Sequence, residues 1–189
     1  AYMAKKVQMD ATIVAPTTAS PAKLKAIEEY GGKIVKHGKT YLERYGKALE
    51  IQRETGACFI HPFDDLDVIA GQGTIGLEIL EDTPEVDTIL VPVGGGGLIS
   101  GISTAVKSLR KDVQVLGVTP EAKPGVYESW RKGRIVDVRD RDTIADGLAV
   151  NRPGRFNLEI MKKNVDGFIF VSEDEIKKAL VTLLEDCHV

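Results

Sequence analysis

The stretch from Thr88 to Leu109 constrains the fold of this chain more than any other. It begins with an apolar, partly β-branched run at residues 88–93, which predicts a buried strand. Four consecutive glycines follow at residues 94–97, and apolar residues then recur at helical spacing as far as Leu109. The pattern therefore predicts a strand, a glycine turn and an amphipathic helix in direct succession.

The glycine turn is typical of an anion-binding site. Residues without a Cβ atom let the backbone adopt dihedral angles closed to other residues and come within hydrogen-bonding distance of a ligand. The following helix offers free N–H groups and the positive end of its dipole. A flexible turn is the alternative, but flexible linkers usually contain Ser, Asn or Lys as well. The turn lacks the Gly-Lys-Ser/Thr ending of a nucleotide P-loop, so we expect the phosphate of something other than ATP.

Strands and helices alternate along the rest of the chain. Apolar runs predict strands at residues 11–15, 33–36, 57–60, 113–118 and 168–171, and helices are expected after Ser20, around Leu42, after Gly76 and after Ser172. Residues 120–157 are rich in Gly and Pro, and we expect functional loops there. Repeated β-α alternation favours parallel sheets flanked by helices, with ligands at the carboxyl ends of the strands. We therefore predict an α/β fold.

Composition narrows the class of function. The chain has 189 residues, 43% of them hydrophobic, and a formal charge of −3 with both signs mixed along it. It has no basic stripe of the kind that nucleic acid requires and no run near the ~20 apolar residues of a membrane span, so we expect neither partner. Cys58 and Cys187 lie far apart without Cys-x-x-Cys pairing, and the apolar neighbours of Cys58 predict a small buried side chain. This cysteine usage fits a cytoplasmic location.

A second glycine motif needs a different interpretation. Gly71, Gly73 and Gly76 match the dinucleotide fingerprint G-x-G-x-x-G. That fingerprint requires a strand directly before it and an acidic residue ~20 positions after it. Here residues 65–70 make a poor strand, and Val91 stands where the acidic residue is needed. We therefore expect no dinucleotide at this motif.

Metal binding is also not predicted. The histidines are His37, His61 and His188, and none has a second histidine or a cysteine at metal-ligand spacing. A cluster of three acidic residues, Asp64, Asp65 and Asp67, could bind a cation, but a solvated loop surface is the favoured interpretation. For His61, which precedes a proline at the end of a predicted strand, a role in positioning the loop is favoured over proton transfer.

Four segments of the chain occur in a familiar order. They are His61-Pro62-Phe63-Asp64-Asp65, Ile69-Ala70-Gly71-Gln72-Gly73-Thr74, Val91-Pro92-Val93-Gly94-Gly95-Gly96-Gly97-Leu98 and Ile144-Ala145-Asp146-Gly147. Together they resemble the threonine dehydratase and serine racemase branch of the fold-type II pyridoxal-phosphate enzymes, over nearly the whole chain. The resemblance implies a tryptophan synthase β-like α/β fold with parallel sheets and two domains. Residues 1–57 would belong to the small mobile domain and residues 58–189 to the large cofactor-binding domain.

The resemblance also implies a cofactor, substrates and site residues. The phosphate of pyridoxal 5'-phosphate would bind to the segment made of Gly94, Gly95, Gly96, Gly97 and Leu98, and Gly147 would lie beside the ring. The reaction implied is the conversion of threonine to 2-oxobutanoate and ammonia, with serine as a second substrate, in a homo-oligomer, either a dimer or a tetramer. Serine racemase is one alternative, and an inactive fragment or phosphate-binding module is another. Arg44 lies where racemases have an arginine near the substrate carboxylate, although a surface arginine is favoured.

The chain departs from the family at several positions. The family's Schiff-base lysine lies in a Ser-Phe-Lys-x-Arg-Gly segment, and its substrate carboxylate is held by a Ser-x-Gly-Asn loop; neither occurs here. We therefore expect a chain truncated at both ends, inactive alone, and assign no catalytic residue. Thr119 and Gly125 stand where racemases have acidic ligands for a divalent cation, so no metal is expected. Residues 146–154 resemble dehydratases more than racemases.

Overall fold

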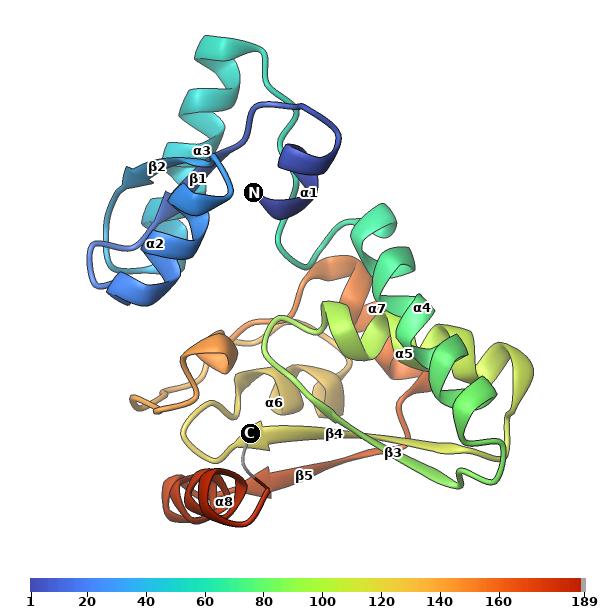
Figure 1. Cartoon of the computed structure of the whole chain (residues 1–189). Helices are drawn as coiled ribbons and strands as arrows, with labels where there is room; N and C mark the ends of the chain where they lie inside the picture. Colours follow the sequence, from blue (N-terminus) through green and yellow to red (C-terminus); the bar gives the residue numbers. More distant parts are fainter. Residues whose placement is uncertain (188–189) are drawn as a thin grey trace. The chain divides into compact units, whose positions relative to one another are not determined.

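The computed structural model describes residues 1–187. The chain divides into two compact units, Ala1–Phe59 (unit 1) and Ile60–Val189 (unit 2). Unit 1 contains the helices and strands that Figure 1 labels α1 to α3 and β1 to β2. They are α1 (Tyr2–Lys6), β1 (Thr12–Ala15), α2 (Pro21–Glu29), β2 (Lys33–Lys36) and α3 (Tyr41–Thr55). The two strands pair in parallel.

Local sequence signals set the helix ends in unit 1. Proline at the first helical position is tolerated because that N–H has no helical acceptor, and α2 begins at Pro21. At the start of α3 the Glu43 side chain accepts the Thr40 N–H at 2.8 Å, and the Thr40 hydroxyl accepts the Glu43 N–H in return. The helix ends at Gly56, whose φ of 70° is left-handed.

The predicted strand at residues 57–60 is wrong. These residues form no strand, and Cys58 is exposed rather than buried. An apolar run becomes a strand only when a neighbouring strand accepts and donates its backbone hydrogen bonds. In the structure this segment instead links the last helix of unit 1 to the first loop of unit 2.

Unit 2 is built around a three-stranded parallel sheet. Its elements are α4 (Leu66–Asp82), β3 (Thr88–Pro92), α5 (Gly97–Leu109), β4 (Gln114–Pro120), α6 (Gly125–Lys132), the 3-10 helix η1 (Asp146–Leu148), α7 (Arg155–Asn164), β5 (Gly167–Val171) and α8 (Glu173–Glu185). The strands lie in the order β3-β4-β5, and both pairings are parallel. The α/β prediction is confirmed.

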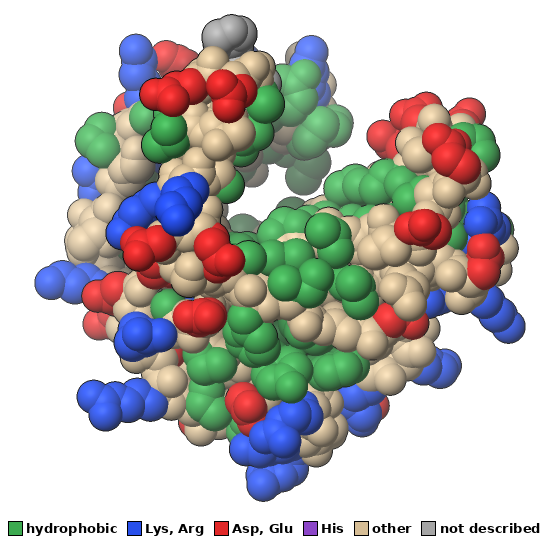
Figure 2. All heavy atoms as spheres, turned by 90° about the horizontal axis from the view of Figure 1, so that it is seen from below, with side chains coloured by type: hydrophobic (Ala, Val, Ile, Leu, Met, Phe, Trp, Pro, Cys, Tyr) green, Lys and Arg blue, Asp and Glu red, His purple; other side chains and the backbone are tan. Residues whose placement is uncertain are grey.

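The core of unit 2 lies on one face of this sheet. Helices α4, α5 and α7 are on the same side of it (Figure 1). The core residues are Ile89, Val91, Val93, Ile99, Ile102, Val106, Val113, Val115, Val126, Met161 and Val165. Side chains alternate along β3, so Val91 is buried whereas Leu90 on the opposite face is 58% exposed. Figure 2, seen from below the sheet of Figure 1, shows hydrophobic side chains gathered on the surface.

The second glycine motif lies inside a helix. Helix α4 begins at Leu66, with Asp65 as its cap, rather than after Gly76 as predicted. The prediction placed the boundary at a glycine because glycine inside a helix lowers the stability of that helix. Here it allows close packing on α5: a Cβ atom at Gly73 would lie 3.2 Å from the Gly101 carbonyl oxygen, and one at Gly76 would lie 3.0 Å from that of Ile102.

The C-terminal helix α8 has no buried residue, in contrast to α4, α5, α6 and α7. It begins with a capping box, in which the Glu175 carboxylate accepts the Ser172 N–H at 2.8 Å and the Ser172 hydroxyl accepts the Glu175 N–H. The helix ends at Glu185, and Leu184 next to this end is 66% exposed. None of the helices within residues 1–187 is long and apolar enough to cross a membrane.

Candidate phosphate-binding site

The glycine turn joins β3 to α5 in a conformation that requires glycine. Gly96 caps α5 with φ 96° and ψ −2°, in the left-handed region where other residues are strained. A Cβ atom at Gly95 would overlap the Phe63 ring, and one at Gly97 would lie 2.9 Å from the Phe63 carbonyl oxygen. The backbone of the turn therefore packs directly on the loop before α4, which leaves no room for side chains.

The N terminus of α5 presents backbone donors without helical acceptors. The first N–H groups of a helix have no partner within it, and in α5 these belong to Gly97, Leu98 and Ile99. The first bond of the helix is donated by the Ser100 N–H to the Gly96 oxygen at 3.0 Å. The N-cap residue, Gly96, has no side chain that could cap this end. The helix dipole and these donors together suit an anion.

The carbonyl group of Gly95 points toward α7. Its oxygen accepts hydrogen bonds from the Asn157 Nδ2 group and from the Gly154 N–H, each at 3.1 Å. Asn157 is completely buried, and its Nδ2 group also donates to the Phe63 oxygen at 2.7 Å. One amide group therefore connects the glycine turn to the loop before α4.

The acidic cluster caps two helices instead of forming the predicted solvated surface. The Asp64 carboxylate accepts N–H groups of Arg155 and Phe156 at the start of α7, both at 2.9 Å. Asp65 does the same at the start of α4, where it accepts the N–H groups of Asp67 and Val68. The solvated-surface interpretation was wrong for Asp64 and Asp65, because their carboxylates accept backbone N–H groups at helix ends.

His61 orders the same loop through its ring. Nδ1 accepts the N–H groups of Phe63 at 3.2 Å and of Asp64 at 2.8 Å, so this nitrogen carries no proton. Burial lowers the pKa of His61, whereas the nearby carboxylates of Asp64 and Asp65 act in the opposite direction. His188 lies outside the described residues. Within residues 1–187, no group of three or more His, Cys, Asp or Glu side chains could hold a metal ion.

The structure brings Gly147 to the glycine turn. A Cβ atom at Gly94 would lie 3.2 Å from the Gly147 carbonyl oxygen, which places η1 beside the first glycine. The five residues expected to hold the phosphate are contiguous in the turn. Arg44 belongs to unit 1, where its Nη1 group donates to the Lys39 oxygen at 3.0 Å.

Thr119 and Gly125, the two positions at which racemases have acidic cation ligands, flank the turn after β4. The Thr119 hydroxyl donates to the Lys123 oxygen at 3.4 Å, and the Gly125 N–H donates to Asn151 Oδ1 at 2.7 Å. The Lys123 ammonium pairs with Asp140 at 2.7 Å, and its side chain is only 11% exposed. Thr119 and Gly125 therefore take part in hydrogen bonds within this region, and the Lys123 charge is neutralised by Asp140.

Sequence reasoning missed three residues that support the turn, namely Asp64, Gly154 and Asn157. The Asp64 bonds to α7 span more than 90 positions, and the bond from Asn157 to Gly95 spans 62. No local pattern marks contacts at such separations. The nearest signal was the occurrence of the His61-Pro62-Phe63-Asp64 segment in the same resemblance as the glycine turn.

Comparison with known protein sequences identifies a family and several relatives of this chain. The family model described as "Pyridoxal-phosphate dependent enzyme" matches residues 1–189. L-threonine ammonia-lyase of Thermotoga maritima is 49% identical over 179 residues, which are 95% of this chain and 45% of that protein. A catabolic L-threonine dehydratase of Staphylococcus aureus is 46% identical over 189 residues, or 100% of this chain and 55% of that protein. The chain thus spans about half the length of these relatives.

The solved structures that superpose on this chain include a serine racemase and a threonine deaminase. Maize serine racemase superposes with a TM-score of 0.94 at 35% identity, covering 100% of this chain and 57% of the racemase. The processed form of threonine deaminase isoform 2 from Solanum lycopersicum gives 0.89 at 36% identity, covering 96% of this chain and 50% of that one.

Proposed function

Because this chain belongs to the pyridoxal-phosphate-dependent enzymes, we propose that it is part of an enzyme that converts threonine to 2-oxobutanoate and ammonia. The observation that carries the proposal is the 49% identity to a threonine ammonia-lyase over 95% of the chain. Serine is the expected second substrate, since it differs from threonine by one methyl group.

The glycine turn is the proposed site of the cofactor phosphate. The N–H groups of Gly96, Gly97 and Leu98 would bind the phosphate oxygens, and the α5 dipole would offset part of the negative charge. Gly147, next to Gly94, would lie beside the ring. The turn fits a phosphate because glycines 94–97 bring no side chains into it and the N-cap residue of α5, Gly96, has no side chain to cap the helix. When bound, the cofactor supplies an electron sink for the carbanion at the substrate α-carbon.

The rest of the enzyme is proposed from the family. Residues 1–57 would form part of the small domain and residues 58–189 part of the large one, which is supported by the division of the chain near Phe59. We assign no catalytic residue in this chain and keep Arg44 as a candidate contact for the substrate carboxylate. A homo-oligomer is proposed, and a cytoplasmic location is supported by two free, exposed cysteines.

The test combines cofactor trapping with product analysis. The protein is incubated with pyridoxal phosphate, reduced with borohydride to fix the cofactor to a lysine, and its intact mass and labelled peptide are determined. L-threonine is then supplied, and 2-oxobutanoate is measured. A labelled lysine together with 2-oxobutanoate supports the proposal. Phosphate binding without any labelled lysine would favour the phosphate-binding module.

Serine racemase is the second candidate, favoured by the TM-score of 0.94 to the maize enzyme. Chiral analysis of the products from L-serine separates the two. Formation of D-serine faster than pyruvate would replace the proposal with a racemase. Pyruvate with little D-serine would retain the ammonia-lyase.

A further inference from the structure

The peptide unit between Gly95 and Gly96 decides which group the glycine turn presents to a ligand. A trans peptide is planar, and its C=O and N–H groups point to opposite sides. The described residues contain no cis peptide bond. Because the Gly95 oxygen points toward α7, the Gly96 N–H points away from it. Reversing this peptide would replace a donor by a carbonyl oxygen, which repels an anion.

The turn itself offers little resistance to such a reversal. The φ of 96° and ψ of −2° at Gly96 are close to the third position of a type II turn. Rotating the central peptide of a type II turn gives a type I turn, in which the same residue has a φ of about −90°. Both residues of this peptide are glycines, so neither has a side chain of its own that would oppose the rotation. The hydrogen bonds to the Gly95 oxygen are therefore the restraint.

Asn157 is built into the fold as a donor for that oxygen. Its side chain is completely buried, and its Nδ2 group faces two carbonyl oxygens, those of Gly95 at 3.1 Å and Phe63 at 2.7 Å. Both partners are acceptors, so only the amide nitrogen can face them. Within the described chain its Oδ1 atom is buried without a partner, which is unfavourable for stability. A buried amide with one unsatisfied atom fits a positioning role better than packing alone.

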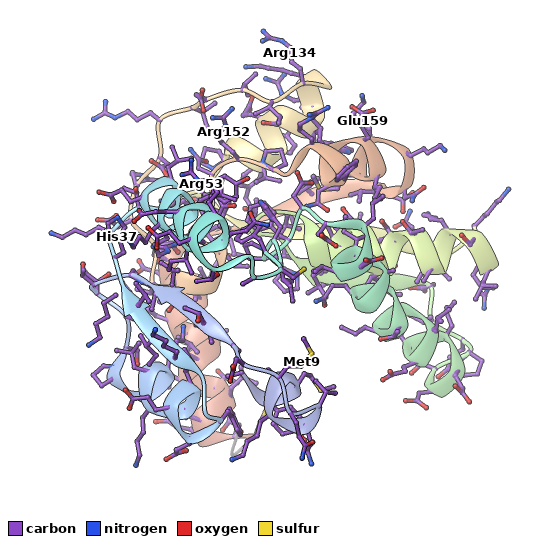
Figure 3. The ribbon with its side chains drawn as sticks, turned by 90° about the horizontal axis from the view of Figure 1, so that it is seen from above. Met9, His37, Arg53, Arg134, Arg152 and Glu159 are labelled. Carbon is purple, nitrogen blue, oxygen red and sulfur yellow. The ribbon has the colours of Figure 1, made fainter. Side chains whose placement is uncertain are left out.

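Asp64 holds Asn157 in place through the backbone of α7. Its carboxylate accepts the N–H groups of Arg155, Phe156 and, at 3.4 Å, Asn157 itself. These hydrogen bonds fix the first turn of α7, from which the Asn157 side chain reaches the glycine turn. Glu159, two residues further on, points outward from the same helix (Figure 3), and its side chain is 70% exposed.

We propose that Asn157 is a positioning residue that locks the Gly95–Gly96 peptide with its N–H toward the bound phosphate. Asp64 supports this lock by capping α7. The inference rests on the proposed function only in taking the glycine turn as the phosphate site. It assigns to Asn157 no contact with the phosphate and no part in the chemistry.

The test measures binding of inorganic phosphate to the full chain through the amide chemical shift of Gly96. Asn157→Leu removes both donated bonds, and we expect the Kd to rise by at least about tenfold. Asn157→Asp has nearly the same volume but, when ionised, cannot donate. Burial raises the pKa of such a carboxyl, and the protonated form donates one bond. The loss of phosphate affinity in Asn157→Asp relative to wild type is therefore expected to become smaller as the pH falls from 8 to 5.5. The loss of affinity in Asn157→Leu relative to wild type stays constant over the same range.

Asn164→Asp is the matched control, because Asn164 lies on the same helix and, among residues 1–187, its side chain donates only to the Thr104 hydroxyl, at 3.3 Å on the surface. Its Kd is expected within twofold of wild type. A Kd within twofold for a cooperatively folded Asn157→Leu would overturn the inference. If Asn157→Leu does not fold, the inference is overturned by a loss of phosphate affinity in Asn157→Asp that does not change with pH. A Gly96 amide that phosphate does not shift in the wild type would also overturn it.

Phosphate binding needs no catalytic lysine, so its outcome is separate from that of the proposed function. If phosphate binding through Gly96 depends on Asn157, while the whole protein of which this chain is part is labelled on a lysine by borohydride yet forms no 2-oxobutanoate from threonine, the inference is retained and the ammonia-lyase is refuted.

Discussion

Single residues determine whether the loop around the glycine turn keeps its shape. His61 orders residues 63 and 64 through an unprotonated Nδ1, and Gly96 supplies a left-handed φ of 96°. At neither position would it be enough for a replacement to match the size of the original residue. In His61 the determining property is the protonation state, and in Gly96 it is the absence of Cβ.

The stability of unit 2 should depend on pH through His61. Burial lowers its pKa from the ordinary value of 6.5, so the unfolded chain takes up the proton first as pH falls. The stability that neutral His61 contributes is complete above pH 6.5 and is lost as pH falls through the lower folded value. His61→Asn keeps an acceptor for the two N–H groups without titrating. Urea unfolding at several pH values should show that the free energy of unfolding falls more steeply below pH 6.5 in wild type than in this variant. Parallel curves for the two proteins would contradict the prediction.

Gly96→Ala should destabilise unit 2 more than an equivalent change elsewhere. The left-handed backbone costs a non-glycine residue about 1–2 kcal/mol. At Gly96 the new Cβ also lies 3.1 Å from the Asn157 Cβ atom and 3.2 Å from Met161 Cε. Gly133 is the control, because its φ is 65° but its Cβ would meet only Lys162 Cε, at 3.9 Å. We expect the unfolding free energy to fall by about 1 kcal/mol more in Gly96→Ala. Equal losses would mean that the site is not crowded.

At the scale of elements, close packing of α4 on α5 is the most specific feature of unit 2. One side of α4 carries Gly73 and Gly76, which approach the backbone of α5 at Gly101 and Ile102. Gly71, in the same helix, is exposed and would have no atom within 4 Å of a Cβ. Three glycines in one helix therefore occupy two different environments.

Alanine substitutions in α4 should accordingly change stability in opposite directions. Gly71→Ala is expected to raise the unfolding free energy by about 0.5–1 kcal/mol, because alanine is the better helix former and nothing obstructs it. Gly76→Ala places a Cβ 3.0 Å from the Ile102 oxygen and 3.3 Å from Ala105 Cβ, which forces the helices apart. We expect a loss of about 1–3 kcal/mol. Denaturant titration of both variants is the measurement, and a stabilised Gly76→Ala would refute the packing explanation.

At the scale of the whole molecule, the sheet of unit 2 is covered unequally. Parallel sheets are normally buried on both faces. Here α4, α5, α7 and the core residues lie on one face (Figure 1), whereas Leu90 and Ile169 remain 58% and 40% exposed. Hydrophobic side chains consequently reach the surface on the side shown in Figure 2.

Neighbouring residues of β3 should therefore respond differently to the same change. Val91→Thr buries a hydroxyl group at a position that is 1% exposed, and a loss of about 1–3 kcal/mol is expected. Leu90→Thr, on the open face, should change the unfolding free energy by no more than about 0.5 kcal/mol. Urea unfolding of the 189-residue chain at low concentration distinguishes the two. A similar loss in both variants would show that the second face is also covered in solution.

Sequence reasoning predicted the elements that local signals control. The strand at residues 88–93, the glycine turn and the helix after it agree with β3 and α5, and Ser20 and Ser172 each precede a helix as expected. It failed at residues 57–60 and at the start of α4. In both places an apolar run or a glycine has two local interpretations, and only contacts with distant residues choose between them.

The sequence by itself determined the alternation of strands and helices, the glycine turn and the family to which its segments point, because these depend on residues a few positions apart. The tertiary structure alone decided that two glycines of α4 pack on α5, that Asp64 caps α7, and that Asn157 holds the Gly95 carbonyl. Those contacts join residues far apart in the chain, and they exist only after the sheet has brought its carboxyl-terminal loops together.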